Sequence, residues 1–193
     1  MAVASVETST IRTFLALPLA SSFEKEVEPI ILRLKKEYPE VRWVQPTEIH
    51  ITLHFFGDIT KGKISETSKL IAPIVSKTKP FQISLKGLGS FPDSKRPRVI
   101  WMGIKGDVEP LIVLQNAIEK ILKQAGFPCE SRSFKPHLTL GRVKFPKRQI
   151  HFQQNDFQTT SPKRMDAIVL FQSHMTPQGA HYETLETFPF SQA

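Results

Sequence analysis

The sequence is poor in cysteine, and Cys129 is the single one among 193 residues. One cysteine excludes an intrachain disulfide framework, and this scarcity is typical of a reducing compartment. We therefore expect a cytoplasmic protein. Cys129 follows Pro128 and has no metal-ligand spacing around it, so we expect an inert, packed thiol.

The sequence also lacks long hydrophobic runs, and none approaches the ~20 residues of a membrane-spanning helix. Residues 1–20 do not resemble a secretory signal, because they lack a basic start and Glu7 and Arg12 interrupt the apolar part. We expect no membrane partner.

Acidic side chains are in the minority, with 18 Asp and Glu against 26 Lys and Arg, which gives a net charge of +8. A basic balance favours anionic partners such as nucleotides or RNA, although ordinary solubility charge explains it equally well. No run of five like charges marks a disordered basic tail.

The hydrophobic patterning predicts helices and strands in mixed order along the chain. Helices are expected over residues 21–38, 63–78 and 109–126. Strands are expected over residues 11–19, 41–45, 49–56, 81–91, 98–105, 137–144, 164–175 and 180–190. This order predicts the α+β class: a single bilobal domain over residues 1–193, with two similar lobes, each an antiparallel sheet with helices on its outer face.

The sequence contains His-apolar-Thr-Leu twice, as HITL from His50 and as HLTL from His137. Because successive strand side chains point to opposite faces, each histidine shares a face with its threonine, about 7 Å along the backbone. Thr52 accompanies His50, and Thr139 accompanies His137. If the two strands lie side by side, both pairs line one site.

Such a site suits phosphodiester chemistry. Opening a phosphodiester needs a base for the nucleophile and an acid for the leaving oxygen, and histidine serves either role near neutral pH. Threonine hydroxyls donate to the non-bridging oxygens, and no metal is needed. A lone histidine in a strand is more often a core or surface residue, so the prediction depends on both copies together.

The remaining histidines and Arg142 leave alternatives open. His54 stands four residues after His50, as in zinc-binding HExxH helices, but Ile51 replaces the glutamate and the segment is predicted as a strand. There His54 shares the face of His50 at about 13 Å, too far for one zinc ion. Strand alternation turns Arg142 away from His137 unless Gly141 allows a bulge. We expect surface or structural roles for His151, His174 and His181.

With these motifs, the chain resembles the two-histidine (2H) phosphoesterase superfamily, and within it the RNA 2′,3′-cyclic phosphodiesterases, also called 2′-5′ RNA ligases. The resemblance covers nearly the whole chain. It rests on the two motif regions VRWVQPTEIHITLHFFGDI and FKPHLTLGRV, the opening segment IRTFLALPL, the central hairpin LKGLGSFPDSKRPRVIWMGI and the closing hairpin IVLFQSHMTPQGAHYETLETFPF.

The resemblance implies an active cleft between the lobes and hydrolysis of a 2′,3′-cyclic phosphate to a 2′-phosphomonoester, with reversible 2′-5′ ligation of RNA ends as a second reaction. It implies that His50 is the proton donor and His137 the proton acceptor. Thr52 and Thr139 would bind the phosphate, and Arg142 would assist substrate binding. The implied partners are RNA ends or nucleotides carrying a 2′,3′-cyclic phosphate, bound by a monomer without metal or cofactor.

Two other functions remain open: a non-catalytic module that binds RNA or nucleotides, and a 2H phosphodiesterase for another substrate, such as 2′-5′ oligoadenylate, a tRNA-splicing intermediate or ADP-ribose cyclic phosphate. Cations that would steer a polyanion toward the site are Arg12, Arg42, Lys135 and Arg148. Phe55, Phe56 and Trp43 are candidates for stacking on a base, although the core is the favoured place for Phe55 and Trp43.

Overall fold

The fold consists of three α-helices, a short 3₁₀ helix and nine strands in a computed structural model that describes residues 9–144, 150, 159–176 and 179–192. The helices are α1 (Ala20–Glu37), η1 (Pro46–Glu48), α2 (Lys61–Val75) and α3 (Val108–Gln124). The strands are β1 (Thr10–Pro18), β2 (Arg42–Trp43), β3 (His50–Thr60), β4 (Phe81–Phe91), β5 (Val99–Gly106), β6 (His137–Arg142), β7 (Lys163–Met165), β8 (Ala167–Thr176) and β9 (Gly179–Pro189).

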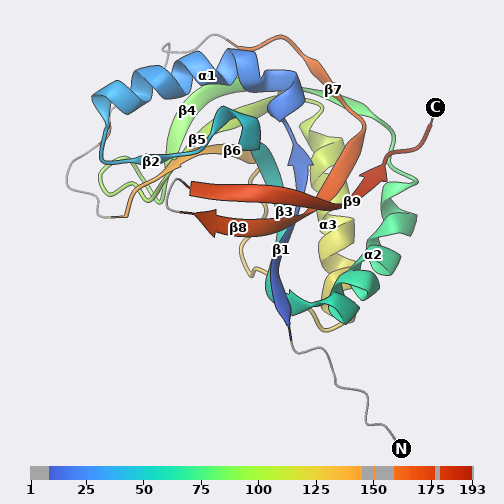
Figure 1. The fold of residues 1–193 in the computed structure, drawn as a ribbon. Coiled ribbons are helices and arrows are strands. Elements are labelled where there is room, and N and C mark those ends of the chain that lie inside the picture. Colours follow the sequence, from blue (N-terminus) through green and yellow to red (C-terminus); the bar gives the residue numbers. More distant parts are fainter. Residues whose placement is uncertain (1–8, 145–149, 151–158, 177–178, 193) are drawn as a thin grey trace, which may run out of the picture.

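The strands form two antiparallel sheets, which confirms the predicted α+β class. One sheet has the order β3-β1-β8-β9 and the other the order β2-β6-β5-β4-β7. The first sheet therefore joins strands from the two ends of the chain, as the blue, teal and red arrows of Figure 1 show. β8 and β9 form the predicted closing hairpin, with Ala167 opposite Pro189.

The helices cover the two sheets separately. α2 and α3 pack together against the first sheet, whereas α1 crosses the second (Figure 1). Glu26 of α1 accepts a hydrogen bond from Ser161 and lies 4.0 Å from the ammonium group of Lys163 on β7. Apolar α1 positions such as Phe23 and Val27 are fully buried. Within the described part of the chain, no helix is both long and apolar enough to cross a membrane.

β3 is irregular at two points, and these irregularities decide which side chains face the core. Its register against β1 shifts between the pairs Ala16–Thr52 and Leu15–His54, so Leu53 is an extra residue. A second shift makes Phe56 extra, because Phe55 pairs with Phe14 and Gly57 with Thr13. Each bulge restarts the alternation of side chains between the two faces of the strand.

Candidate active site

His50 begins β3 and lies on the predicted face of that strand. Ile51 and Leu53 are buried, His50 is half-buried and Thr52 is exposed, so the first part of the strand alternates as predicted. The His50 ring is 4.9 Å from that of Phe14 on β1 and 5.1 Å from that of Tyr182 on β9. These aromatic rings form an apolar wall beside the imidazole.

His137 begins β6 in the same manner. Leu138 and Leu140 are buried, whereas His137 and Thr139 are half-buried. The His137 ring is 5.1 Å from that of Phe91 on β4 and 6.4 Å from that of Trp101 on β5. Each histidine therefore starts a strand and packs against aromatic rings of its own sheet.

The two imidazoles share one hydrogen-bonding arrangement. Nδ1 of His50 donates to the backbone carbonyl of Glu48 at 2.8 Å, and Nδ1 of His137 donates to that of Lys135 at 2.7 Å. Because a carbonyl oxygen only accepts, Nδ1 carries the proton in both neutral rings. Nε2 of each ring then keeps its lone pair, which is the form that acts as a base.

Several contacts bring the starts of β3 and β6 near each other although they belong to different sheets. β2 pairs with β6, and the amide of Val44 donates to the carbonyl of Leu140 at 2.9 Å. From Val44 the chain passes through η1 directly to His50, and β3 contacts β6. His50 is also within electrostatic reach of His137 and Arg142.

The environment disfavours the protonated form of both histidines. Burial lowers the pKa of His50 to about 4, and the charges of Arg142 and His137 add to this effect, while the Glu48 carbonyl opposes it. Burial also lowers the pKa of His137, again with help from Arg142 and against the Lys135 carbonyl. Near neutral pH both rings are therefore neutral before an anion binds.

Arg142 is turned toward this site by a bulge in β6. Thr139 pairs with Trp101 and Gly141 with Ile100, so Leu140 is the extra residue, one position before the glycine singled out in the sequence. Leu140 and Gly141 are both buried and Arg142 is exposed. The Arg142 charge acts on His50, on His137 and on Tyr182, which agrees with the face of the motif residues.

Sequence reasoning missed Tyr182, whereas its neighbour His181, with a side chain that is 68% exposed, fits the expected surface or structural role. Nδ1 of His181 donates to a carboxylate oxygen of Glu48 at 2.7 Å, so Glu48 holds His181 by its side chain and His50 by its backbone. Burial and the Glu48 charge raise the pKa of Tyr182. No local pattern identifies Tyr182, because β9 reaches the site only through the strand order of its sheet.

The prediction for His54 is wrong. The bulge at Leu53 turns His54 to the buried face, opposite to Thr52, where Nδ1 donates to Oε2 of Glu119 at 2.8 Å. Gln115, one turn earlier on α3, donates to the Leu53 carbonyl at 3.3 Å. α3 thus binds the bulged segment at two points.

The core preference for Phe55 is also wrong. Phe55 is 50% exposed, and the guanidinium of Arg12 lies 4.8 Å from its ring centroid. Arg12 also contacts Asp58 at 3.8 Å, so its charge is partly compensated. Trp43 is half-buried against the core as expected.

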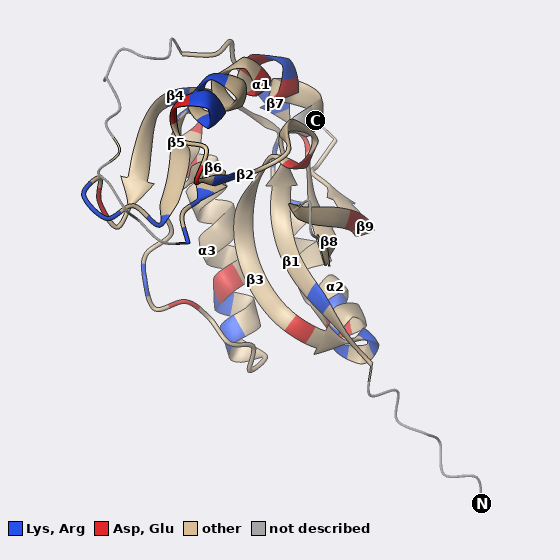
Figure 2. Cartoon of the chain, turned by 60° about the vertical axis from the view of Figure 1, so that its left-hand side comes forward, with Lys and Arg blue, Asp and Glu red and all other residues tan. Residues whose placement is uncertain are grey.

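The remaining predictions concern the cations expected to attract a polyanion and the histidines outside the motifs. Figure 2 shows Lys and Arg spread over several elements, interleaved with Asp and Glu, rather than gathered on one of them. His174 contacts Glu183 at 3.0 Å in the β8–β9 hairpin, which fits a structural role. Arg148 and His151 lie outside the described residues.

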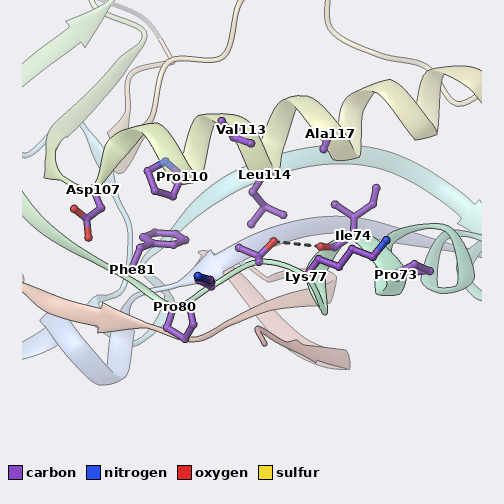
Figure 3. A pocket seen from close by; sticks show the side chains of 12 residues that line it. Pro73, Ile74, Lys77, Pro80, Phe81, Asp107, Pro110, Val113, Leu114 and Ala117 are labelled. Carbon is purple, nitrogen blue, oxygen red and sulfur yellow. Dashed lines mark hydrogen bonds between the residues drawn. The ribbon is translucent and has the colours of Figure 1, made fainter. Parts of the chain in front are cut away.

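A groove between α2 and α3 is separate from the histidines. It measures about 580 Å³ and includes Ile74, Phe81 and Leu114 in its wall (Figure 3). None of the five candidate site residues lines it. The groove is therefore not part of the site that the two motifs form.

Comparison with known proteins identifies relatives over most of the chain. The chain matches the family described as LigT like Phosphoesterase over residues 17–101 and 104–182. A protein of Methanothermobacter thermautotrophicus named RNA 2′,3′-cyclic phosphodiesterase is 32% identical over 182 residues, covering 92% of this chain and 98% of the relative. One of the same name from Archaeoglobus fulgidus is 34% identical over 179 residues, covering 92% and 99%.

Solved structures share the fold. A crystal structure described as a phosphoesterase has a TM-score of 0.79 at 24% identity and covers 95% of this chain and 99% of its own. E. coli LigT in complex with 3′-AMP has a TM-score of 0.76 at 23% identity, with the same coverage. The match over most of the sequence, together with the relatives above 30% identity, shows that this chain belongs to the LigT-like phosphoesterase family.

Proposed function

We propose that this chain hydrolyses the 2′,3′-cyclic phosphate of RNA ends or nucleotides to a 2′-phosphomonoester. The observation that carries the proposal is the matched pair His50 and His137, each with its Nδ1 anchored to a backbone carbonyl and its Nε2 available for proton transfer. The relatives named RNA 2′,3′-cyclic phosphodiesterase support the choice of substrate.

In the proposed reaction the two histidines act on opposite sides of the phosphorus. Nε2 of neutral His137 removes a proton from water, and the water oxygen forms a bond to phosphorus. The bond from phosphorus to the 3′ oxygen breaks, and protonated His50 donates its Nε2 proton to that oxygen. The products are a 3′-hydroxyl and a 2′-phosphate. Acid-base catalysis of this kind contributes roughly 10²–10⁴-fold per group.

Three further side chains are proposed to bind the phosphate. Thr52 and Thr139 supply hydroxyl donors for the non-bridging oxygens, where negative charge accumulates in the transition state. Arg142 supplies the positive charge, and its guanidinium geometry suits two parallel hydrogen bonds to a phosphate. The electrostatic effect of Arg142 on both histidines supports a place for it beside the same phosphate.

The low pKa of His50 sets a condition on its role as proton donor. At a pKa of about 4 the free imidazole is almost wholly neutral at pH 7. A bound phosphate offsets the Arg142 charge and brings a negative charge next to the ring, and both effects raise the pKa. We therefore propose that the substrate itself promotes protonation of His50.

Ligation of RNA ends would use a 5′-hydroxyl in place of water: His137 removes its proton, its oxygen bonds to phosphorus, and the bond from phosphorus to the 3′ oxygen breaks as His50 protonates that oxygen, which leaves a 2′-5′ linkage. In the reverse reaction the 3′-hydroxyl attacks phosphorus and the 5′ oxygen leaves, with the two histidines exchanging roles. Because His50 and His137 have equivalent hydrogen bonds, the same pair can act in either direction. A module that binds RNA or nucleotides without turnover is the alternative to an enzyme, and the assay below distinguishes these two functions.

The test is hydrolysis of 2′,3′-cyclic AMP and of an RNA ending in a 2′,3′-cyclic phosphate, with the 2′- and 3′-monophosphates resolved by chromatography. We expect the 2′-monophosphate, in the presence or absence of a chelator. His50→Ala and His137→Ala should each lower kcat/KM by roughly 10²-fold or more, with circular dichroism unchanged. His174→Ala, in the exposed pair with Glu183, is the matched control and should keep wild-type activity.

The other outcomes decide between the alternatives. Binding without turnover, with an affinity that falls steeply with salt, would replace the enzyme by a binding module. Turnover of ADP-ribose cyclic phosphate or of a 2′-5′ oligoadenylate alone would assign a different substrate to the same residues. Near-normal activity of His137→Ala would exclude the proposed base.

A further inference from the structure

Three side chains capable of binding a metal meet on the buried side of β3, apart from the candidate active site. They are His54 on β3, Glu119 on α3 and Cys129 in the segment between α3 and β6. One ligand atom from each residue lies within 4.8 Å of the others. His54 is 6% exposed, and the other two residues are half-buried.

The hydrogen bonds of this cluster are incomplete. Oε2 of Glu119 accepts from Nδ1 of His54 at 2.8 Å, and Oε1 accepts from the Glu130 amide at 3.3 Å. Nε2 of His54 is buried and has no hydrogen-bond partner among the residues that the structure describes. The two nitrogens of an imidazole point to different sides of the ring, and Nδ1 is the one that faces Glu119. An ion shared with Glu119 would therefore bind Nδ1, and the ring proton would move to Nε2.

Two simpler explanations account for part of the cluster. As a packing residue, Cys129 would direct its weak thiol donor to the carbonyls of Phe127 and Glu119, at 3.4 and 3.7 Å. As a nucleophile, Cys129 would need a lowered pKa, but burial and the Glu119 charge raise the pKa of its thiol.

We propose that His54, Glu119 and Cys129 bind a zinc ion, with water as the fourth ligand. Thiolate, imidazole and carboxylate are the ligands that zinc takes in proteins, whereas Mg²⁺ and Ca²⁺ prefer oxygen alone. Tetrahedral zinc with bonds of about 2.0–2.3 Å places ligand atoms about 3.5 Å apart. On binding, the widest of these separations would close by ~1 Å and the 2.8 Å contact of His54 with Glu119 would widen. The Nδ1 proton of His54 would move to Nε2, and the Cys129 thiol would release its proton to solvent.

Such an ion would join parts of both halves of the fold. His54 belongs to the strand that begins with His50, and Cys129 belongs to the segment that leads into His137. Glu119 lies on α3, which also binds the bulge at Leu53 through Gln115. Since the bulge turns His54 away from the face of Thr52, we assign the ion a structural role. Zinc is expected to raise the melting temperature and to leave turnover well below that temperature unchanged.

Cobalt substitution tests this site directly, because Cys129 is the single cysteine of the chain. Demetallated full-length protein is titrated with Co²⁺, and the near-ultraviolet charge-transfer absorption from thiolate to cobalt is recorded. We expect a saturating band at one equivalent, displaced by Zn²⁺, and a melting temperature that rises with Zn²⁺. Cys129→Ser should abolish the band, and His54→Gln and Glu119→Gln should each weaken cobalt affinity at least tenfold.

Control variants distinguish the proposed zinc site from the proposed catalytic site. His174→Gln removes the histidine of an exposed pair with Glu183 in the β8–β9 hairpin, which contains no cysteine, and it should leave the band unchanged. If His54→Gln fails to fold, Glu119→Gln carries the comparison. A missing thiolate band, or a zinc-dependent rise in melting temperature that Cys129→Ser retains, would overturn the site. Neither result bears on hydrolysis by His50 and His137.

Discussion

His50 and His137 are anchored in the same way, each with its Nδ1 bonded to the carbonyl two residues earlier, at 2.8 and 2.7 Å. The backbone that enters each strand therefore fixes the tautomer and orientation of its imidazole. The surroundings differ, since Phe14 and Tyr182 flank His50 while Phe91 and Trp101 flank His137. The pair is thus equivalent in hydrogen bonding and unequal in environment, and the inequality can be measured.

Replacement of His50 should change how stability depends on pH. The pKa of His50 is about 4 in the folded chain and near 6.5 when unfolded, so the unfolded state binds more protons between these values. The stability that the neutral His50 ring contributes is fully present above the pKa of the unfolded state. It is lost as the pH falls toward the pKa of the folded state. Between roughly pH 7.5 and pH 5, wild type should lose about 2 kcal/mol more than His50→Gln. Urea unfolding at both pH values measures this difference, and equal losses would contradict the buried neutral imidazole.

Anion binding should be coupled to proton uptake. A dianion beside Arg142 raises the depressed pKa values of His50 and His137, so protons bind together with the ligand. Sulfate is the suitable probe, because it does not titrate in this range. Its affinity should strengthen as pH falls from roughly 8 to 6. Calorimetry in buffers of different ionisation enthalpy measures the protons taken up, and a pH-independent affinity without uptake would rule out the coupling.

Most strands, the three helices and the faces of the two motifs could be predicted from sequence because they depend on local periodicity. The strand expected over residues 164–175 is an exception, since it divides at Asp166 into β7 and β8, which belong to different sheets. The alternation of Ile51 with Thr52, and of Leu138 with Thr139, is present in the structure. The order of the strands was not predictable, because β1 lies between β3 and β8 through contacts distant in sequence. Tyr182 consequently escaped sequence reasoning.

The bulges explain the errors at His54 and the doubt at Arg142. A bulge reverses the face of every side chain that follows it, and its signal is weak in sequence. Leu53 and Leu140 read as ordinary apolar strand residues, yet each is the extra residue of its strand. For Arg142 the sequence gave a hint in Gly141. The structure excludes a side chain at this position, because a Cβ would lie 2.6 Å from Val41 and 2.9 Å from the Trp43 ring. For His54 the decisive partners, Gln115 and Glu119, are on a distant helix.

Gly89→Ala should damage the wall beside His137. A Cβ at Gly89 would lie 2.3 Å from the Trp101 ring, which is 6.4 Å from that of His137. The ring has to move, and such overpacking typically costs about 1–3 kcal/mol. We expect lower stability and lower kcat/KM for the cyclic phosphate.

The matched control for this substitution is Gly62→Ala in α2, where an added Cβ meets nothing nearer than Oγ1 of Thr60 at 3.9 Å. Alanine favours a helix over glycine by ~1 kcal/mol, so this variant should be as stable as wild type or more so. Thermal unfolding and a kinetic assay of both variants make the comparison. Equal behaviour of the two variants would show that the Trp101 ring adapts without cost.

Arg142 should act through both its charge and its geometry. Arg142→Ala removes a charged partner of the phosphate worth about 1.5–3 kcal/mol, so kcat/KM should fall by roughly 10- to 100-fold. Arg142→Lys keeps the charge and loses the paired hydrogen bonds, so it should recover only part of the activity. The His50 ring gives a readout independent of turnover, because the Arg142 charge lowers its pKa. NMR titration should therefore find a higher His50 pKa in Arg142→Ala and a nearly unchanged one in Arg142→Lys. Wild-type kcat/KM together with an unshifted His50 in Arg142→Ala would remove Arg142 from the site.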